Sequence, residues 1–294
     1  MKILNFGSAN IDHKYRTESF VLPGETTQCA EYIKNSGGKG LNQSVALAKA
    51  GAEVYHAGII GPDGGFLREE LEANKVDCRF LKTIDAPSGH AVIEVEDSGQ
   101  NRIIIYPGTN RMITEDYAEE VLSFFSPGDV VLLQNEINLI PYIMRRAFEK
   151  GMRVAFNAAP MDKNVLSNPL DTVSWLIVNE TEGEFLTGET VPEKIADSIS
   201  ERWKKTALVL TLGTDGCLYR DGAQSISLPA KEVRAVDTTG AGDTFTGFFL
   251  ASAVCGKSPE YSLRLATAAA ALSVTRPGAS VSVPSLEEAE DFMK

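Results

Sequence analysis

Residues 129–157 read DVVLLQNEINLIPYIMRRAFEKGMRVAFN, and this stretch holds one repeating unit of the predicted fold. Apolar runs at 129–134 and 153–157 flank a segment at 138–150 whose apolar residues recur at helical spacing. Short runs that are apolar at almost every position are typical of parallel strands with both faces covered. The stretch therefore predicts a strand, a helix and a second strand of a parallel sheet.

The same alternation continues along most of the chain. The chain becomes helical again from residue 242 and closes with a short helix that starts near Pro284 or Ser285. This order predicts an α/β fold, with a doubly wound and mainly parallel sheet flanked by helices, in one domain spanning residues 1–294. Further strands are predicted at 3–7, 54–61, 175–179 and 207–213, and helices at 41–50, 66–75, 116–125, 180–187 and 192–204.

Two segments interrupt this alternation. Residues 12–36 contain no convincing helix, and residues 89–106 read as two strands around a DSGQ turn. Together they predict a small β-sheet beside the main domain, which would act as a lid. An exposed sheet face commonly pairs with a second copy, so we expect a homodimer formed through this lid.

The composition limits the partners and the compartment. The 294 residues are 43% hydrophobic and carry a net charge of −12, which argues against nucleic acid or an anionic membrane as the main partner. No apolar run has the length of a membrane helix, and the amino-terminal one is too short for a signal peptide. The four cysteines are far apart and form no CxxC pair, so we expect reduced thiols in a cytoplasmic protein.

A glycine-rich loop, AVDTTGAGDTF at 235–245, directly precedes a strongly helical run. A helix start exposes unpaired N–H groups and a partial positive charge, and glycines let an anion come close. Gly240, Ala241 and Gly242 are therefore candidates for an anion hole that holds a phosphoryl group. Asp243 follows at once, and its carboxylate would be useful there if it accepts a proton from a hydroxyl that attacks the phosphate. The alternative is that Asp243 only caps the helix.

Polar residues gather at a second glycine cluster, SGGKGLNQS at 36–44, and after two predicted strands. Ligands of open α/β sheets bind at the carboxyl ends of strands, and carboxylate and amide side chains suit a neutral, polyhydroxylated ligand. The alternative is that these residues only solvate their loops. The candidates are Asn10, Asp12, Gly38, Lys39, Asn42 and Glu136.

Taken together, these segments resemble the ribokinase-like sugar kinases, the PfkB carbohydrate kinase family. The resemblance implies ATP-dependent phosphorylation of the primary hydroxyl of a free sugar, with D-ribose as the favoured substrate and Mg²⁺ beside ATP. It rests on motifs along the whole chain: GSANIDH (7–13), PGET (23–26), SGGKGLNQSVALAKAGA (36–52), VNETEGEFLTG (178–188), TLGTDG (211–216), VDTTGAGDTFTGFFLA (236–251) and AAALSVTRPGASVSVP (269–284).

The resemblance also assigns roles to individual residues. It implies that Asp243 is the catalytic base and that the amides of Gly240, Ala241 and Gly242 neutralise charge on the transferring γ-phosphoryl group. Asn10, Asp12, Gly38, Lys39, Asn42 and Glu136 match the sugar-binding positions of the family. Asn179 and Glu182 lie in the motif associated with Mg²⁺ and the ATP phosphates, and the nucleotide loop is matched by Thr211, Gly213 and Gly216.

A monovalent cation, usually K⁺, is implied next to the anion hole. Coordination by oxygen alone suits a hard cation, and most of the matching positions would donate main-chain oxygens. The alternative is that Asp237 only caps its loop. The matching positions are Asp237, Thr239, Ser273, Arg276, Gly278 and Ser282.

Three positions depart from the family pattern. Thr267 falls where relatives often carry Asn or His near the adenine, and Ile11 and Lys14 differ from typical members beside the first motif. The substrate therefore remains open among ribose, 2-deoxyribose, fructose or another ketose, and a nucleoside.

The rival functions need side chains that are sparse here. A nucleoside would need an aromatic shelf, for which residues 12–36 offer Tyr15, Phe20 and Tyr32. A phosphorylated sugar would need basic residues facing the site, where Lys39 is the obvious one. A sugar-binding sensor without catalysis is a further alternative, which the intact Asp243 disfavours.

Overall fold

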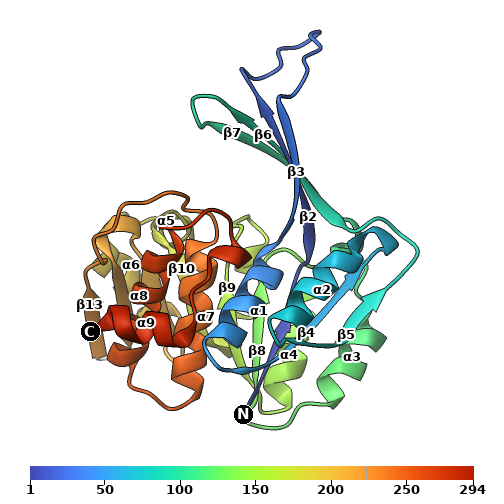
Figure 1. Cartoon of the computed structure of the whole chain (residues 1–294). Helices are drawn as coiled ribbons and strands as arrows, with labels where there is room; N and C mark the ends of the chain where they lie inside the picture. Colours follow the sequence, from blue (N-terminus) through green and yellow to red (C-terminus); the bar gives the residue numbers. More distant parts are fainter. Residues whose placement is uncertain (223) are drawn as a thin grey trace.

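The computed structural model describes residues 1–222 and 224–294, which form a large sheet, a small sheet and the helices around them (Figure 1). Within these residues the large sheet has nine strands in the order β13-β12-β11-β10-β9-β8-β1-β4-β5. Its members are β1 (Lys2–Phe6), β4 (Glu53–Ile60), β5 (Asp77–Thr83), β8 (Val130–Gln134), β9 (Arg153–Asn157), β10 (Val173–Asn179), β11 (Ala207–Thr211), β12 (Cys217–Asp221) and β13 (Gln224–Leu228).

The centre of the large sheet is parallel. Strand β1 pairs in parallel with β4 and with β8, and parallel pairing continues to β5 on one side and through β9 and β10 to β11 on the other. Strands β12 and β13 add an antiparallel hairpin at one edge. The prediction of a mainly parallel α/β sheet is therefore confirmed.

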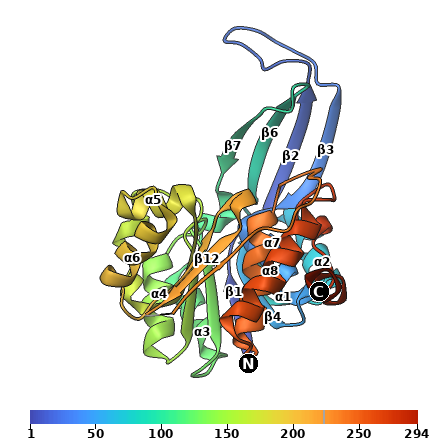
Figure 2. The same ribbon diagram turned by 90° about the vertical axis from the view of Figure 1, so that its left-hand side faces the viewer.

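Helices cover both faces of this sheet (Figure 2). Helices α3 to α6 pack their apolar residues on one face, and α1, α2, α7, α8 and α9 pack theirs on the other. The helices are α1 (Lys39–Lys49), α2 (Gly65–Ala73), α3 (Glu115–Ser123), α4 (Ile140–Glu149), α5 (Glu180–Thr187), α6 (Pro192–Arg202), α7 (Ala241–Val254), α8 (Pro259–Ser273) and α9 (Leu286–Met293).

Helix α7 is the most deeply placed of these elements. Every residue from Asp243 to Ser252 is buried, so the helix is apolar on nearly all sides and is held by packing rather than by one amphipathic face. Its first turn is consequently a rigid support for any side chain that it carries.

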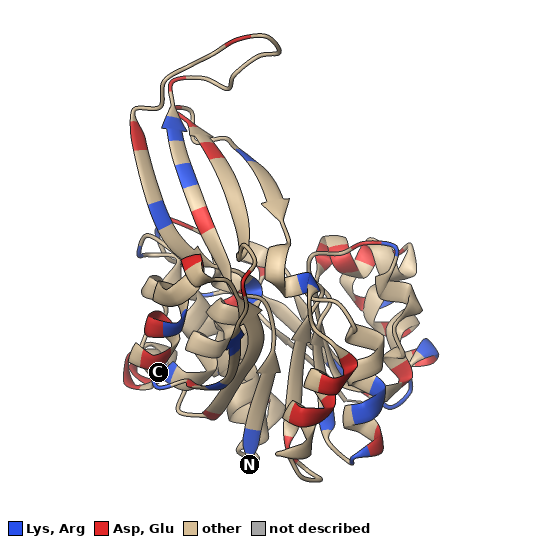
Figure 3. Cartoon of the chain, turned by 90° about the vertical axis from the view of Figure 1, so that its right-hand side faces the viewer, with Lys and Arg blue, Asp and Glu red and all other residues tan. Residues whose placement is uncertain are grey.

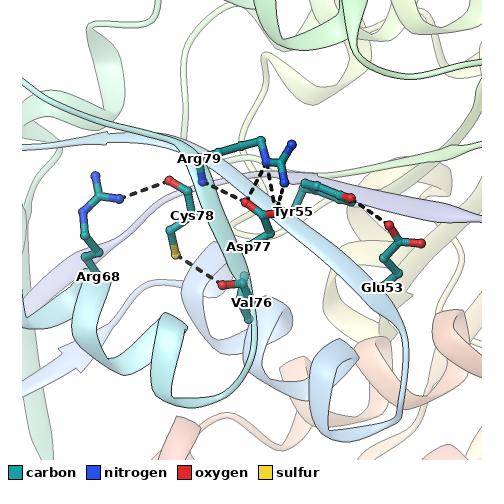
Figure 4. A network of polar contacts seen from close by, with 7 residues as sticks. All are labelled: Glu53, Tyr55, Arg68, Val76, Asp77, Cys78 and Arg79. Atoms are coloured by element: carbon teal, nitrogen blue, oxygen red, sulfur yellow. Dashed lines mark hydrogen bonds and ion pairs between the residues drawn. The ribbon is translucent and has the colours of Figure 1, made fainter.

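The edge strands were missed by the sequence patterns, because they are polar and do not form apolar runs. In β5 (DCRFLKT) polar and apolar residues are mixed, and Arg79 donates to Asp77 of the same strand across 2.7 Å (Figure 4). Arg68 of α2 reaches over and donates to the carbonyl oxygen of Cys78 across 3.1 Å. The hairpin of β12 and β13 was also not predicted.

The small sheet has the strand order β3-β2-β6-β7 and projects from one end of the large sheet (Figure 1). It consists of β2 (Asn10–Thr17), β3 (Glu31–Gly37), β6 (Gly89–Glu96) and β7 (Asn101–Tyr106). Strand β2 pairs in parallel with β6, whereas the two outer pairings are antiparallel. The predicted small sheet is therefore present, and its two sequence segments meet through the central β2–β6 pair. We call this sheet the lid sheet.

The connection from β1 to the lid sheet packs against the start of α1 without room for side chains. A Cβ atom added at Gly7 would lie 2.7 Å from the Cα of Gly40, and one added at Gly40 would lie 2.3 Å from the backbone nitrogen of Ser8. Such separations are too short for non-bonded atoms, so both positions need glycine. The contact fixes the root of the lid sheet against α1.

The surface carries both signs of charge. On the face shown in Figure 3, acidic and basic residues are interspersed over the outer helices, and the lid sheet carries both kinds. Among the described residues, no helix is long and apolar enough to cross a membrane. The cysteines are free thiols, of which Cys78 and Cys217 are buried and Cys29 and Cys255 are exposed.

Candidate active site

The predicted catalytic aspartate lies where two helices from distant parts of the chain start. Asp243, in the first turn of α7, has a side chain aimed at α1, and the residue is 7% exposed. Its Oδ2 accepts a hydrogen bond from Nδ2 of Asn42 (3.0 Å), and its Oδ1 accepts one from Nε2 of Gln43 (2.8 Å). The carboxylate is thus held by two amide donors, and the helix-cap alternative does not describe it, because Gly240 occupies the N-cap position.

The glycine turn before Asp243 leads into the start of α7 and borders open space. Gly240 adopts a left-handed conformation with φ of 75°, and a Cβ there would lie 3.0 Å from the Cβ of Ala279. A Cβ added at Gly242 would meet no atom within 4 Å, so open space lies in front of this residue. The first N–H groups of α7 belong to a helix start and carry its partial positive charge, and that of Ala241 makes a long hydrogen bond of 3.3 Å to the carbonyl oxygen of Thr238.

Among the predicted sugar-binding residues, Glu136 is hydrogen-bonded to the backbone of Lys39. The Oε2 of Glu136, just past β8, accepts from the backbone N–H of Lys39 (2.8 Å) and from the hydroxyl of Ser8. Burial raises the pKa of Glu136. The charge of Asp243 is the largest effect on Lys39 and raises the pKa of its ammonium, so this cation lies among the site carboxylates.

Two predicted residues lie on the lid sheet rather than at the end of a central strand. Strand β1 ends at Phe6, and the chain has already entered β2 at Asn10, so Asn10 and Asp12 reach the site from the lid sheet. The carbonyl oxygen of the Asn10 side chain accepts from Asn110 (2.7 Å). Burial, followed by the charge of Glu136, raises the pKa of Asp12 to about 6.

Gly38 completes this side of the site. It has φ of 90°, a value that favours glycine, and a Cβ there would lie 3.0 Å from the hydroxyl oxygen of Ser8 and 3.1 Å from the backbone nitrogen of Asn10. The six predicted sugar-binding residues are therefore brought together around the junction of α1, β2 and β8.

The predicted nucleotide residues form a neighbouring group. Asn179 and Glu182 form a capping box at the start of α5, with the carboxylate of Glu182 accepting from the backbone N–H of Asn179 (2.9 Å). The pKa of Glu182 is raised, mainly by burial, although the hydrogen bond from Asn179 and the charge of Lys39 act against this, so Lys39 lies close enough to influence both groups of predicted residues. Thr211 is the register partner of Asn179 in the adjacent strand.

The loop after Thr211 holds two glycines in different surroundings. A Cβ at Gly213 would meet no atom within 4 Å, so this residue borders open space. A Cβ at Gly216 would lie 2.0 Å from the carbonyl oxygen of Leu228, so Gly216 is needed for packing against the edge hairpin. Thr267 lies on α8 with its hydroxyl 3.7 Å from the sulfur of Cys217.

The predicted cation positions lie in the loop before α7 and in the segment from the last residue of α8 to Ser282, and Asp237 joins the two. Its Oδ1 accepts from the backbone N–H of Thr239 (2.9 Å) and from the Thr239 hydroxyl (2.6 Å), and its Oδ2 accepts from the backbone N–H of Gly278 (3.0 Å). Burial acts to raise the pKa of Asp237, but these hydrogen bonds outweigh it and the pKa is lowered. Asp237 therefore does cap its loop, and it also ties that loop to the one after α8.

The remaining cation positions use their side chains elsewhere. The guanidinium of Arg276 pairs with Glu288 across 2.6 Å, and the hydroxyls of Ser273 and Ser282 donate to main-chain carbonyls of their own turns. The charge of Arg276 excludes its side chain as a cation ligand, whereas main-chain oxygens and the hydroxyl oxygens of Ser273 and Ser282 can still offer lone pairs. Coordination by oxygen alone, which hard cations prefer, stays a prediction for these positions.

Sequence reasoning missed residues that support the predicted ones. Ser8 donates to Glu136, Asn110 donates to Asn10, and Gln43 donates to Asp243. Ser8 and Gln43 lie inside sequence motifs in which other residues were predicted to form the site, whereas Asn110 lies in no such motif.

Comparison with known proteins is consistent along the whole chain. The family described as pfkB family carbohydrate kinase matches residues 1–286. The chain is 33% identical to a ribokinase of Haemophilus influenzae, over 98% of this chain and 97% of the relative, and 29% identical to a deoxyribokinase of Salmonella typhi, over 100% and 99%. The structure of Arabidopsis thaliana ribokinase complexed with ribose and ATP is similar to this one, with a TM-score of 0.89, 32% identity and coverage of 99% of this chain and 98% of that one.

Proposed function

The chain belongs to the pfkB family of carbohydrate kinases, and from this premise we propose that it transfers the γ-phosphoryl group of ATP to the primary hydroxyl of D-ribose, giving ribose 5-phosphate. The observation that carries the proposal is the meeting of Asp243 with Asn42 at the start of two helices. That contact brings the candidate base and the glycine turn before it next to the predicted sugar-binding residues. The relatives named ribokinase supply the choice of sugar.

Asp243 acts as the general base in this proposal. It accepts the proton of the sugar hydroxyl as that oxygen attacks the γ-phosphorus, and the bond from phosphorus to the β,γ-bridging oxygen breaks. The N–H groups at Gly240, Ala241 and Gly242 stabilise the negative charge on the phosphoryl oxygens during the transfer. The ammonium of Lys39 lies among the carboxylates and adds positive charge at the same place.

Sugar recognition is assigned to the group around the lid root. Asp12 and Glu136 accept hydrogen bonds from sugar hydroxyls, and Asn10 and Asn42 supply amide groups, while Gly38 lets the backbone pack closely against Ser8 and Asn10. The predominance of carboxylate and amide groups supports a neutral sugar over a phosphorylated one.

ATP is assigned to the side formed by Asn179, Thr211 and Gly213, where the backbone at Gly213 borders open space. Glu182 uses Oε2 for its helix cap, and its other carboxylate oxygen fits a role toward hydrated Mg²⁺, which prefers oxygen ligands and keeps several waters. Bound Mg²⁺ would neutralise charge on the ATP phosphates. The loops joined by Asp237 supply oxygens for K⁺, which would order the glycine turn.

A homodimer through the lid sheet is the proposed assembly. Paired residues share a face of a sheet, so Ile33, Ile93 and Lys14 lie on the same face as Asp12, and Ile103 and Ile105 join them on β7. Ile103 is 54% exposed and Ile105 is 55% exposed, and a second copy would cover them. Replacing both with lysine should give a monomer by light scattering, whereas Ile104→Lys, on the opposite face, should leave the dimer unchanged.

We also propose that residues 1–294 act as one kinase domain with the lid sheet as its closing element. The cytoplasm is the proposed location, and the free state of the four cysteines supports it.

An ADP-release assay over a panel of sugars tests the proposed activity. D-Ribose, 2-deoxyribose, fructose and a nucleoside are compared at equal concentration, with and without MgCl₂, and we expect the highest kcat/KM with ribose. The similarity to a deoxyribokinase makes 2-deoxyribose the competing candidate. A larger kcat/KM with any other member of the panel would overturn the assignment of ribose, and binding without ADP release would support a sensor.

A further inference from the structure

Gln43 lies directly behind the proposed catalytic base and is fully buried. Its side-chain nitrogen donates to Oδ1 of Asp243 (2.8 Å) and to Oδ1 of Asn157 (2.9 Å). Its side-chain oxygen accepts from Nε2 of Gln134 (2.7 Å). Both N–H groups and the carbonyl of this amide are therefore in use.

A main-chain carbonyl determines the orientation of Asn157, one of the neighbours of Gln43. The nitrogen of the Asn157 side chain donates to the carbonyl oxygen of Ile177 (3.1 Å). A main-chain carbonyl can only accept a hydrogen bond, so the nitrogen of the Asn157 side chain must face Ile177 and its oxygen must face Gln43. The side-chain nitrogen of Gln43 is therefore the donor to that oxygen.

The orientation of the other neighbour, Gln134, is determined through Asn5. The side-chain nitrogen of Asn5 donates to the carbonyl oxygen of Gly40 (2.7 Å), so its oxygen accepts from Nε2 of Gln134 (2.9 Å). The nitrogen of Gln134 then also faces the oxygen of Gln43. Starting from two separate main-chain carbonyls, the hydrogen bonds require the same orientation of the Gln43 amide, with its nitrogen toward Asp243.

We propose that Gln43 is a positioning residue that holds the Asp243 carboxylate in the orientation for proton transfer, an inference that rests on the proposed kinase function. Asn42 holds Oδ2 and Gln43 holds Oδ1, so the carboxylate cannot rotate without losing a hydrogen bond to a buried donor. A reversed Gln43 amide would set an oxygen against a carboxylate. Gln43 has no exposed surface and therefore acts on the reaction only through Asp243.

The test compares Gln43→Met, Gln43→Glu and a matched control, with kcat, KM for ribose and melting temperature measured from pH 6 to pH 9. Methionine fills a similar volume without hydrogen bonds. The control is Thr206→Val, which removes a buried hydroxyl that donates to the carbonyl oxygen of Val173 (2.9 Å) far from Asp243. It removes a buried hydrogen-bonding side chain without touching the site, so it reports what a loss of buried hydrogen bonding alone does to stability and turnover.

We expect Gln43→Met to lower kcat roughly 30- to 100-fold while KM for ribose changes less than about threefold, because the sugar still binds but the base is misplaced. In Gln43→Glu the new carboxyl group can donate to Asp243 when protonated and repels it when ionised. Its kcat relative to wild type should therefore fall as pH rises, by roughly tenfold more at pH 9 than at pH 6. Thr206→Val should lose melting temperature but keep kcat.

Three outcomes would overturn the inference. One is wild-type kcat in Gln43→Met, and another is a loss in Gln43→Met that Thr206→Val reproduces at an equal loss of melting temperature. The third is a Gln43→Glu deficit that is constant with pH. These leave the kinase function standing, because wild-type turnover of ribose is measured in the same series. A wild-type protein without ADP release would instead contradict the kinase function and the inference together.

Discussion

The side chain of Asn42 on α1 donates to the carboxylate of Asp243 on α7 across 3.0 Å, although the two residues are 201 positions apart in the sequence. This contact joins the helix that follows the lid sheet to the helix that follows the glycine turn. The proposed sugar side and the proposed phosphoryl side of the site are thus coupled by a direct hydrogen bond.

Asp243→Asn should abolish most turnover with little change in fold. An amide cannot accept the proton of the attacking hydroxyl, so kcat should fall roughly 100- to 10,000-fold. The substituted side chain keeps the volume of the original one, and far-UV circular dichroism should be unchanged. ADP release by this variant at the wild-type rate would rule out Asp243 as the base.

Gly242→Ala and Gly240→Ala should separate catalysis from folding. Open space faces Gly242, so alanine there should keep the melting temperature within a few degrees and still lower kcat, because the methyl group enters the anion site. Gly240 has φ of 75°, so alanine there should cost about 1 kcal/mol or more of unfolding free energy. Equal kcat in Gly242→Ala and wild type would place the phosphoryl group elsewhere.

Asp12 should give a dependence of sugar binding on pH. Its pKa is raised to about 6, so below that pH the carboxyl is protonated and accepts hydrogen bonds less well, and KM for ribose should rise as pH falls through 6. Asp12→Asn should raise KM at pH 8 and flatten this rise. A profile that is unchanged in Asp12→Asn would assign the rise to another group.

The same substitution should raise stability at pH 8. Above pH 6 the native state holds an ionised carboxylate that burial disfavours, whereas the unfolded state loses its proton near the ordinary carboxyl pKa. A neutral side chain removes this cost, which we put at about 1–2 kcal/mol after allowing for the partial exposure of Asp12. Urea unfolding at pH 8 measures it, and at pH 4 the gain should have largely disappeared. A loss of stability at pH 8 would contradict this account.

His56 should make the protein sensitive to acid. It is fully buried, and burial, followed by the charge of Arg68, lowers its pKa to about 3. Between pH 6.5 and 3 the unfolded state takes up a proton that the native histidine does not, so stability should fall by several kcal/mol across this range, roughly 3–5 kcal/mol. His56→Gln should show a shallower fall in urea unfolding than wild type. Parallel curves for the two proteins would mean that carboxylates alone set the acid limit.

Asp237→Ala should remove the response to K⁺. The substitution deletes the acceptor of the hydrogen bonds from Thr239 and Gly278, so the two loops separate and their carbonyl oxygens no longer converge. We expect wild-type kcat to be several-fold higher in KCl than in NaCl at equal ionic strength, and the variant to show equal, low values. A wild-type enzyme that is indifferent to the cation would contradict the K⁺ proposal itself.

The fold was predictable where burial is uniform. Central strands such as 129–134 and 153–157 are apolar at nearly every position because helices cover both of their faces, and this pattern is visible in the sequence. The edge strand β5 was not predictable in this way, since it has no continuous apolar run. Its contacts include a hydrogen bond from Arg68 of α2 and the pair of Arg79 with Asp77.

The candidate site was predictable through motifs but not through its supporting contacts. Glycine turns followed by polar residues mark where ligands can approach, so Asp243 and Lys39 could be found from local sequence. Gln43 looks like an ordinary polar residue of a helix. Its role depends on Asp243, 200 positions away, and on Asn157, which the folded chain alone brings beside it.

The glycine contact between residues 7 and 40 has a consequence for engineering. Because backbone meets backbone there, the root of the lid sheet and the first turn of α1 form one interlocking seam, with no side chain available to adjust a misfit. A chimera that borrows the lid sheet of a relative, to change which sugar is accepted, should therefore carry both halves of the seam from the same parent. Grafts that divide residues 7–9 from residues 37–40 should express as insoluble protein, whereas grafts that keep them together should remain soluble.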